Sequence, residues 1–194
     1  MRKTASKKQV QAFQIKATLN GIRPPIWRRF LVRGDMTLEQ LHGTLQCLME
    51  NWYDYHLHQF TIKGFLYGPE EVDTFGDEEL KDESRYRIDQ VLSDPGETFL
   101  YEYDFGDGWE VGLKLEKMLP VEEGTAYPLC IKGKRAAPPD DCGGIPGYYD
   151  LVGNMSHPGT PEYDDSVEWL GGEPINFEEF DIEAVNGCLQ RLKV

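Results

Sequence analysis

The sequence predicts an α+β fold with a largely antiparallel sheet built from hairpins, one long helix in the N-terminal half, and short C-terminal helices. Over residues 13–32 and again over residues 98–118, apolar residues alternate with polar ones on both sides of a turn. This is the pattern of a β-hairpin with one apolar face. Between the two hairpins, residues 38–49 carry apolar side chains at the three- and four-residue spacing of a helix.

The first hairpin turns at Asn20-Gly21, after a strand whose apolar residues are Phe13, Ile15, Ala17 and Leu19. The returning strand covers residues 26–32, and its pairing begins after Pro25, because prolines lack a backbone N–H donor. The helix follows from Leu38 to about Glu50, and its start is marked by the capping-box residues Thr37 and Gln40.

The middle of the chain predicts a third strand, a loop and a short turn. Residues 56–62 alternate as a strand does, and residues 88–92 form a short helix or turn. Residues 68–84 are crowded with acids and contain one lysine, so self-repulsion predicts a mobile acidic loop there.

The second hairpin surrounds an FGDG turn. Its apolar face comprises Phe99, Tyr101, Tyr103 and Phe105 on one arm and Trp109, Val111, Leu113 and Leu115 on the other. At the turn, Asp104 and Asp107 form a small carboxylate cluster beside Trp109.

The C-terminal part predicts one long loop followed by helices. Residues 127–151 are rich in glycine and proline and form the loop, and the last of two or three short helices starts near Asp181. We therefore expect a flexible basic tail at residues 1–9 and a single α+β domain at residues 10–194.

Composition indicates a soluble globular protein. The chain has 194 residues, 40% of them hydrophobic, and a mean hydropathy of -0.53. It has no apolar run near the roughly 20 residues of a membrane span, and no apolar segment follows the basic start as in a secretory signal. We expect a cytoplasmic protein without a membrane partner, whose four widely spaced cysteines are reduced thiols.

Charge is distributed unevenly along the chain. The net charge is -14, yet the first 33 residues contain nine Lys or Arg and no acid. Either these bases pair with acids inside the domain, or they form a local anion-binding patch. The acidic total argues against broad nucleic-acid binding, because the phosphate backbone would be repelled.

His56 and His58 are the candidate ligands for a divalent metal. Their spacing on a strand directs both imidazoles to one side, and carboxylates from other loops would complete the site: Asp104, Asp107, Asp140 and Asp141. The alternative is a pair of hydrogen-bonded core histidines, because Phe60 and Ile62 share the same strand face.

Two basic segments are candidates for ligand recognition. Trp27 with Arg28 and Arg29 suits stacking on a base, although packing on one side and solvent on the other explains the same pattern. Arg135 lies on a basic edge before the PPDDCGG segment, whose glycines suit a backbone anion nest.

Five motifs in order resemble the plasmid pRiA4b ORF-3-like family: GIRPPIWRRFLV, LxxLH, HLHQF, YDFGDGWE and PPDDCGGIPGY. The resemblance spans nearly the whole chain. It implies a single α+β domain associated with plasmids or mobile elements, in a largely uncharacterised family. Ala137 stands where the family often has cysteine, which weakens any three-cysteine metal site.

The leading functional prediction is a non-enzymatic binding or interaction domain for an unknown protein or small molecule. The residues expected to recognise the ligand are Trp27, Arg28, Arg29, Asp104, Asp107, Trp109, Arg135, Asp140 and Asp141. The alternatives are a metal-dependent hydrolase acting on phosphodiesters, with His56 and His58 as ligands and Asp104 or Asp107 as ligand or general base, and a nucleic-acid-binding protein that uses its basic N-terminal strands.

Overall fold

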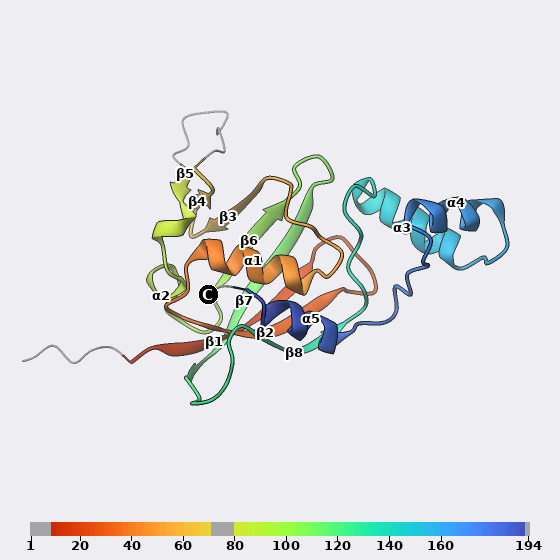
Figure 1. Ribbon diagram of the computed structural model, residues 1–194. Coiled ribbons are helices and arrows are strands. Elements are labelled where there is room, and N and C mark those ends of the chain that lie inside the picture. Colours follow the sequence, from red (N-terminus) through yellow and green to blue (C-terminus); the bar gives the residue numbers. More distant parts are fainter. Residues whose placement is uncertain (1–8, 71–79, 193–194) are drawn as a thin grey trace, which may run out of the picture.

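The computed structural model describes residues 9–70 and 80–192 and contains one sheet with helices around it (Figure 1). The strands are β1 Gln11–Leu19, β2 Trp27–Arg33, β3 His58–Ile62, β4 Phe65–Gly68, β5 Leu80–Asp82, β6 Thr98–Tyr103, β7 Trp109–Pro120 and β8 Leu129–Lys134. The helices are α1 Leu38–Leu48, α2 Ile88–Val91, α3 Gly144–Met155, α4 Pro161–Trp169 and α5 Ile182–Leu189, with a 3₁₀ turn at Glu83–Arg85.

The sheet has eight strands in the order β5-β4-β3-β6-β7-β1-β2-β8. Every neighbouring pair is antiparallel except β4 and β5, so the predicted antiparallel sheet is confirmed. The two hairpins form as predicted: β1 pairs with β2, and β6 pairs with β7 from Tyr103 opposite Trp109. Phe105 departs from the predicted apolar face, because it lies in the turn beyond β6 and is 47% exposed.

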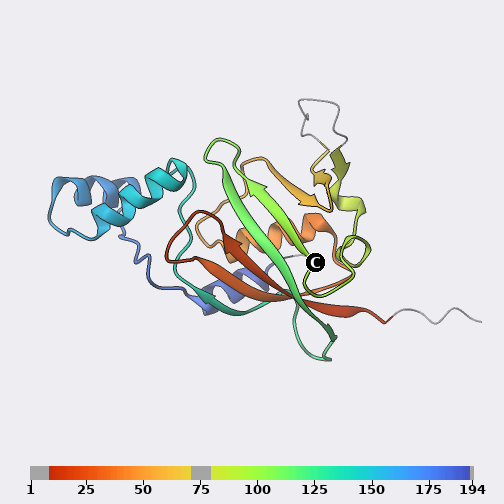
Figure 2. The ribbon, with the colours of Figure 1, turned by 180° about the vertical axis from the view of Figure 1, so that it is seen from behind.

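Helices α1 and α5 lie on the same face of the sheet, as the views from opposite sides show (Figures 1 and 2). The capping box of α1 is present: Gln40 N donates to Thr37 Oγ1 at 3.2 Å, and Thr37 N donates to Gln40 Oε1 at 2.9 Å. Helix α1 lies where the sequence predicted a helix, but with 11 residues against the 12 of α3, its description as the one long helix is not confirmed. Asp181 caps α5, as expected.

The predicted loop at residues 127–151 is wrong in most of its length, since it contains β8 and the start of α3. The glycines that suggested a loop have packing roles. A Cβ on Gly133 would lie 2.3 Å from the ring of Phe180, so glycine here permits close approach of α5's entry segment to the strand.

The predicted acidic loop is only partly within the described residues. Residues 71–79 lie outside them, whereas Leu80–Asp82 forms β5, parallel to β4. Lys81 Nζ lies 3.6 Å from the centre of the Phe65 ring, a cation–π contact that joins these edge strands. Residues 1–8 of the predicted basic tail also lie outside the described residues.

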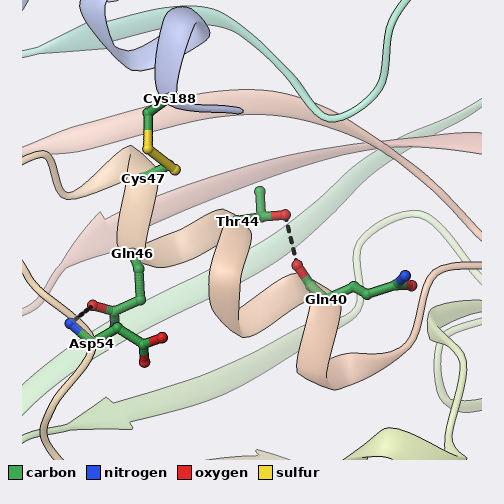
Figure 3. Close-up of a disulfide and its surroundings, with 6 residues drawn as sticks. All are labelled: Gln40, Thr44, Gln46, Cys47, Asp54 and Cys188. Atoms are coloured by element: carbon green, nitrogen blue, oxygen red, sulfur yellow. Dashed lines mark hydrogen bonds between the residues drawn. A yellow bond between two sulfur atoms is a disulfide. The ribbon is translucent and has the colours of Figure 1, made fainter. Parts of the chain in front are cut away.

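A disulfide between Cys47 and Cys188 joins α1 to α5, with Cα atoms 5.7 Å apart (Figure 3). The prediction of four reduced thiols is therefore wrong. The two cysteines are 141 positions apart, and only the packing of both helices on one sheet face brings them together. Cys130 and Cys142 remain free thiols, and burial raises their pKa values to about 11 and about 12.

The core lies between the sheet and α1. It contains the inward residues of the central strands, such as Phe13, Phe30 and Tyr101, and the apolar face of α1. In residues 9–70 and 80–192, no helix has the length and apolar character needed to cross a membrane.

Candidate functional site

Three segments that are far apart in the sequence meet at one end of the sheet: residues 51–57 before β3, the turn at residues 104–108 between β6 and β7, and residues 140–143 before α3. Backbone contacts join them. Asp104 N donates to Leu57 O at 2.9 Å, and Asp140 N donates to Asn51 O at 3.3 Å. Gly143 N donates to Asp107 Oδ2 at 3.1 Å, so all three motif segments converge.

His56, Asp104 and Asp141 each offer a ligand atom, and these atoms lie within 4.8 Å of one another. Asp104 Oδ1 lies 3.7 Å from His56 Nδ1, and Asp141 Oδ1 lies 3.4 Å from His56 Nε2. The two carboxylates approach different nitrogens of the His56 ring, and one ion binds only one of these nitrogens. Two ligand atoms about 2.2 Å from one ion can be at most about 4.4 Å apart, so the three side chains must adjust to share an ion. His56 Nε2 is buried without a hydrogen-bond partner among the described residues.

Asp104 is held by its own turn. Its φ is +53°, in the left-handed region that Asp tolerates better than most residues. Its Oδ1 accepts hydrogen bonds from Gly106 N at 3.0 Å and Asp107 N at 3.3 Å. The FGDG turn therefore directs this carboxylate into the site and leaves only 9% of its side chain exposed.

Asp140 and Asp141 are adjacent but have different environments. Asp141 has φ +57°, its side chain is 61% exposed, and its Oδ2 accepts a hydrogen bond from Tyr55 Oη at 3.2 Å. Asp140 is buried, and its Oδ2 accepts from Tyr53 N at 2.8 Å and Tyr103 Oη at 3.3 Å. Burial raises the pKa of Asp140, although these hydrogen bonds and nearby His56 act in the opposite direction.

His58 does not share the site with His56. Strand β3 begins only at His58, so the strand alternation that would put both imidazoles on one side does not extend to His56. His58 is buried and its Nε2 lies 3.0 Å from Glu83 Oε1. Its environment is therefore that of a hydrogen-bonded core histidine, the alternative that the sequence left open.

The imidazole of His42, in α1, stacks on that of His58 with ring centroids 3.5 Å apart. His42 Nε2 lies 2.6 Å from Asp54 Oδ1, and His42 Nδ1 lies 2.7 Å from Tyr101 Oη. This network anchors the segment that carries His56, because Asp54 belongs to it. His42 is not among the residues predicted from the sequence, where its signal is a polar residue within the apolar face of a helix.

The other predicted recognition residues are buried in the core or make their contacts with residues outside the cluster. Arg28 is fully buried and bonds Glu50, Arg29 bonds Glu116, and Arg135 donates to Glu178 Oε1 at 2.6 Å. Trp109 is 1% exposed in the core. Trp27 lies under Lys16, whose Nζ is 5.2 Å from the ring centre.

Exposed apolar side chains belong to two of the three segments that form the cluster. Before β3 these are Tyr53, Tyr55 and Leu57, and in the hairpin turn there is Phe105. The Tyr55 ring lies 4.6 Å from that of His56. We call His56, Asp104, Asp141 and these four residues the recognition surface, since exposed aromatic groups beside polar ones are typical of binding sites.

Comparison with known proteins finds relatives over most of the chain. A family model described as plasmid pRiA4b ORF-3-like protein matches residues 11–187. An uncharacterized protein, y4hQ of Sinorhizobium fredii, is 32% identical over 181 residues, which cover 92% of this chain and 91% of that protein. The crystal structure of MM3350, a protein of unknown function from Methanosarcina mazei Go1, is 38% identical with a TM-score of 0.78, covering 91% of this chain and 98% of that one.

Proposed function

The chain belongs to the plasmid pRiA4b ORF-3-like protein family, and from that premise we propose that it is a binding domain whose recognition surface holds a divalent cation on His56, Asp104 and Asp141. The plasmid origin in the family description supports a role in plasmid or mobile-element biology. A disulfide such as Cys47–Cys188 is uncommon in a reducing cytosol, so it does not support the expected cytoplasmic location.

The observation that carries the proposal is the convergence of three potential ligands from three separate segments. An imidazole with two carboxylates suits zinc, manganese or iron, whereas calcium prefers six to eight oxygens. The buried, unpartnered Nε2 of His56 fits this donor set, since an unpaired buried nitrogen is costly unless something binds it.

A metal-dependent hydrolase is the second candidate, and the exposure of Asp141 favours it. Three protein ligands leave coordination positions open, and the 61% exposed side chain of Asp141 places those positions at the surface. In this hydrolase His56, Asp104 and Asp141 are the metal ligands, while His58 is not a ligand. Asp104 suits the ligand role better than Asp107, because Asp104 Oδ1 lies 3.7 Å from His56 Nδ1 and Asp104 belongs to the cluster whose ligand atoms converge.

Nucleic-acid binding by the N-terminal strands gains no support. Arg28 forms an ion pair with Glu50, Arg29 with Glu116, and Arg33 with Asp35. Each of these charges is therefore matched inside the domain, as one of the two sequence-based readings expected.

Calorimetric titration of chelator-treated protein with zinc or manganese tests the metal site. We expect one ion per chain, and an affinity at least about tenfold lower in His56→Ala and Asp104→Asn, because each loses a ligand. Asp104→Asn keeps the oxygen that the turn requires. His157→Ala is the matched control, since His157 is exposed at the end of α3. Absence of binding, or equal binding by His56→Ala, would refute the site.

The hydrolase reading needs a separate measurement. With saturating manganese or zinc, hydrolysis of bis(4-nitrophenyl) phosphate by the wild type and not by His56→Ala would support it. Metal binding without any turnover above the His56→Ala background would leave the protein a metal-containing binding domain.

A further inference from the structure

The second place where this molecule offers a binding surface is the pair of helices α3 and α4, which stand beside the sheet as a separate lobe (Figures 1 and 2). The lobe is fixed to the body at its base. Tyr148 of α3 packs edge-on against Phe177 with ring centroids 5.3 Å apart, and Arg23 N donates to Tyr149 Oη at 2.8 Å. Its outer surface therefore has a defined position.

The lobe contains an apolar pocket of about 290 Å³ between the end of α3, the start of α4 and residues 174–178. Its walls are mostly apolar, from Val152, Met155, Pro158, Tyr163, Ile175 and Phe177. The volume lies just below the range of roughly 300–1,000 Å³ that is typical of small-molecule sites. It suits one apolar side chain of a partner rather than a whole small ligand.

The segments around this pocket carry negative charge that basic side chains largely leave unpaired. Residues 136–190 contain twelve Asp and Glu and no Lys or Arg. Within the described part of the chain, Glu178 is the one acid of α3, α4 and residues 170–178 that forms an ion pair, with Arg135. Exposed Glu162 and Glu173 directly adjoin the pocket residues Tyr163 and Pro174 in the sequence, and Glu178 itself lines the pocket, so carboxylates border it.

The charge identifies the chemistry of the partner. An uncompensated acidic surface attracts cationic segments and repels anionic ones, and it speeds their encounter. Trp169, 51% exposed at the end of α4, adds an aromatic face on which a lysine or arginine can lie.

We propose that the α3–α4 lobe is a docking surface for a lysine- or arginine-rich peptide segment of another protein, which places one apolar side chain in the pocket. The apolar residue supplies burial, and the flanking cations meet the acids of α4. This proposal does not depend on the metal site, since the two use different residues at different places.

Fluorescence anisotropy with labelled pentapeptides tests the docking surface on the full chain. The first peptide has four lysines around a central leucine, the second has serine at the centre, and the third has four glutamates around leucine. We expect the first to bind, the second to bind about tenfold more weakly because no apolar side chain enters the pocket, and the third not to bind. Added salt should weaken binding of the first peptide.

Matched variants locate the binding. Glu162→Lys with Glu173→Lys should weaken the leucine peptide at least about fivefold, whereas the same charge change in the loop after β7, Glu122→Lys with Glu123→Lys, should have little effect. Ile175→Ser should abolish the preference for leucine over serine. Circular dichroism of each variant verifies that it is folded.

Three results would overturn the proposal. The first is equal binding of the leucine and serine peptides, and the second is an equal effect of the two double charge reversals. The third concerns a different occupant: if sedimentation shows self-association of the full chain that Glu162→Lys with Glu173→Lys abolishes, the lobe binds a second copy.

Discussion

Arg28 and Arg29 are neighbours on β2 with opposite surroundings. Strand alternation turns Arg28 into the core and Arg29 toward the outer face of the sheet. Arg28 donates to three backbone carbonyls and to both oxygens of Glu50, and its guanidinium lies 3.9 Å from the centre of the Phe180 ring. Burial lowers the pKa of Arg28, while Glu50 opposes this effect. Such an arginine organises the fold and is inaccessible to a ligand.

Arg28→Ala should therefore be strongly destabilising. Its removal leaves Glu50 and the three carbonyls without their partner, and breaking a buried pair in this way costs about 3–5 kcal/mol of unfolding free energy. Arg33→Ala, which removes a half-exposed pair with Asp35, should cost less than about 1 kcal/mol. Urea denaturation of both variants measures the difference, and similar losses would contradict the assigned role of Arg28.

Glu116 predicts a pH dependence of stability. Hydrogen bonds from Arg29, and then from Gln14, lower the pKa of Glu116 from 4.5 to about 2. Because the pKa is lower in the folded state, the stabilisation is complete above pH 4.5 and is lost as the pH falls toward 2. Glu116→Gln should be less stable than wild type at pH 7, with a difference that shrinks at pH 4 and 3. A constant difference in urea denaturation across this range would contradict the prediction, and Glu122→Gln serves as the exposed control.

Helix α3 contains glycines that are typical of loops in a sequence but are required here by close packing. A Cβ on Gly147 would lie 1.7 Å from Cys142 O, and one on Gly144 would lie 2.6 Å from Asp107 O. These glycines let the first turn of α3 fold tightly against residues 140–143 and the FGDG turn. The helix thereby fixes the loop that carries Asp141.

Two alanine substitutions in α3 should have opposite effects. Gly147→Ala should destabilise the fold at the upper end of the roughly 1–3 kcal/mol typical of overpacking, and it should also weaken metal binding through Asp141. Gly153→Ala meets nothing within 4 Å and should stabilise the helix by about 0.5–1 kcal/mol. Thermal unfolding and metal titration of both variants check this contrast, which fails if the two behave alike.

Elements with a complete local signal were predicted, and those that depend on distant partners were not. The β6–β7 hairpin and the cap of α1 are encoded in neighbouring residues. Strand β8 forms by pairing with β2, and strand β5 forms by pairing with β4, so both depend on residues far away in the sequence. The sequence predicted His56 as a ligand because it would lie on the same side of one strand as His58. The fold does not make that arrangement, whereas Asp104, Asp140 and Asp141 do converge with His56. Their convergence depends on long-range packing that single-sequence patterns do not report.

At the scale of the whole molecule, the disulfide closes a long loop between α1 and the last helix. Cross-linking residues 141 positions apart restricts the unfolded chain, and such a bond typically contributes about 2–4 kcal/mol. Cys188→Ser should lower stability by an amount in this range. Alkylation of the unfolded wild type should label two thiols without reductant and four with it, counted by mass spectrometry. Four labelled thiols without reductant would show that the bond does not form.

The place of β1 in the sheet has a consequence for how the protein is made. Strand β1 lies between β2 and β7, so one of its edges is covered by the next strand to emerge from the ribosome. The other edge stays open until Trp109–Pro120 has been translated, and β2 in turn waits for Leu129–Lys134. During synthesis the nascent chain therefore carries an apolar hairpin with two unpaired edges, a form prone to wrong pairing. The first 33 residues, which include this hairpin, contain nine Lys or Arg and no acid, and like charges on edge strands oppose edge-to-edge pairing between chains.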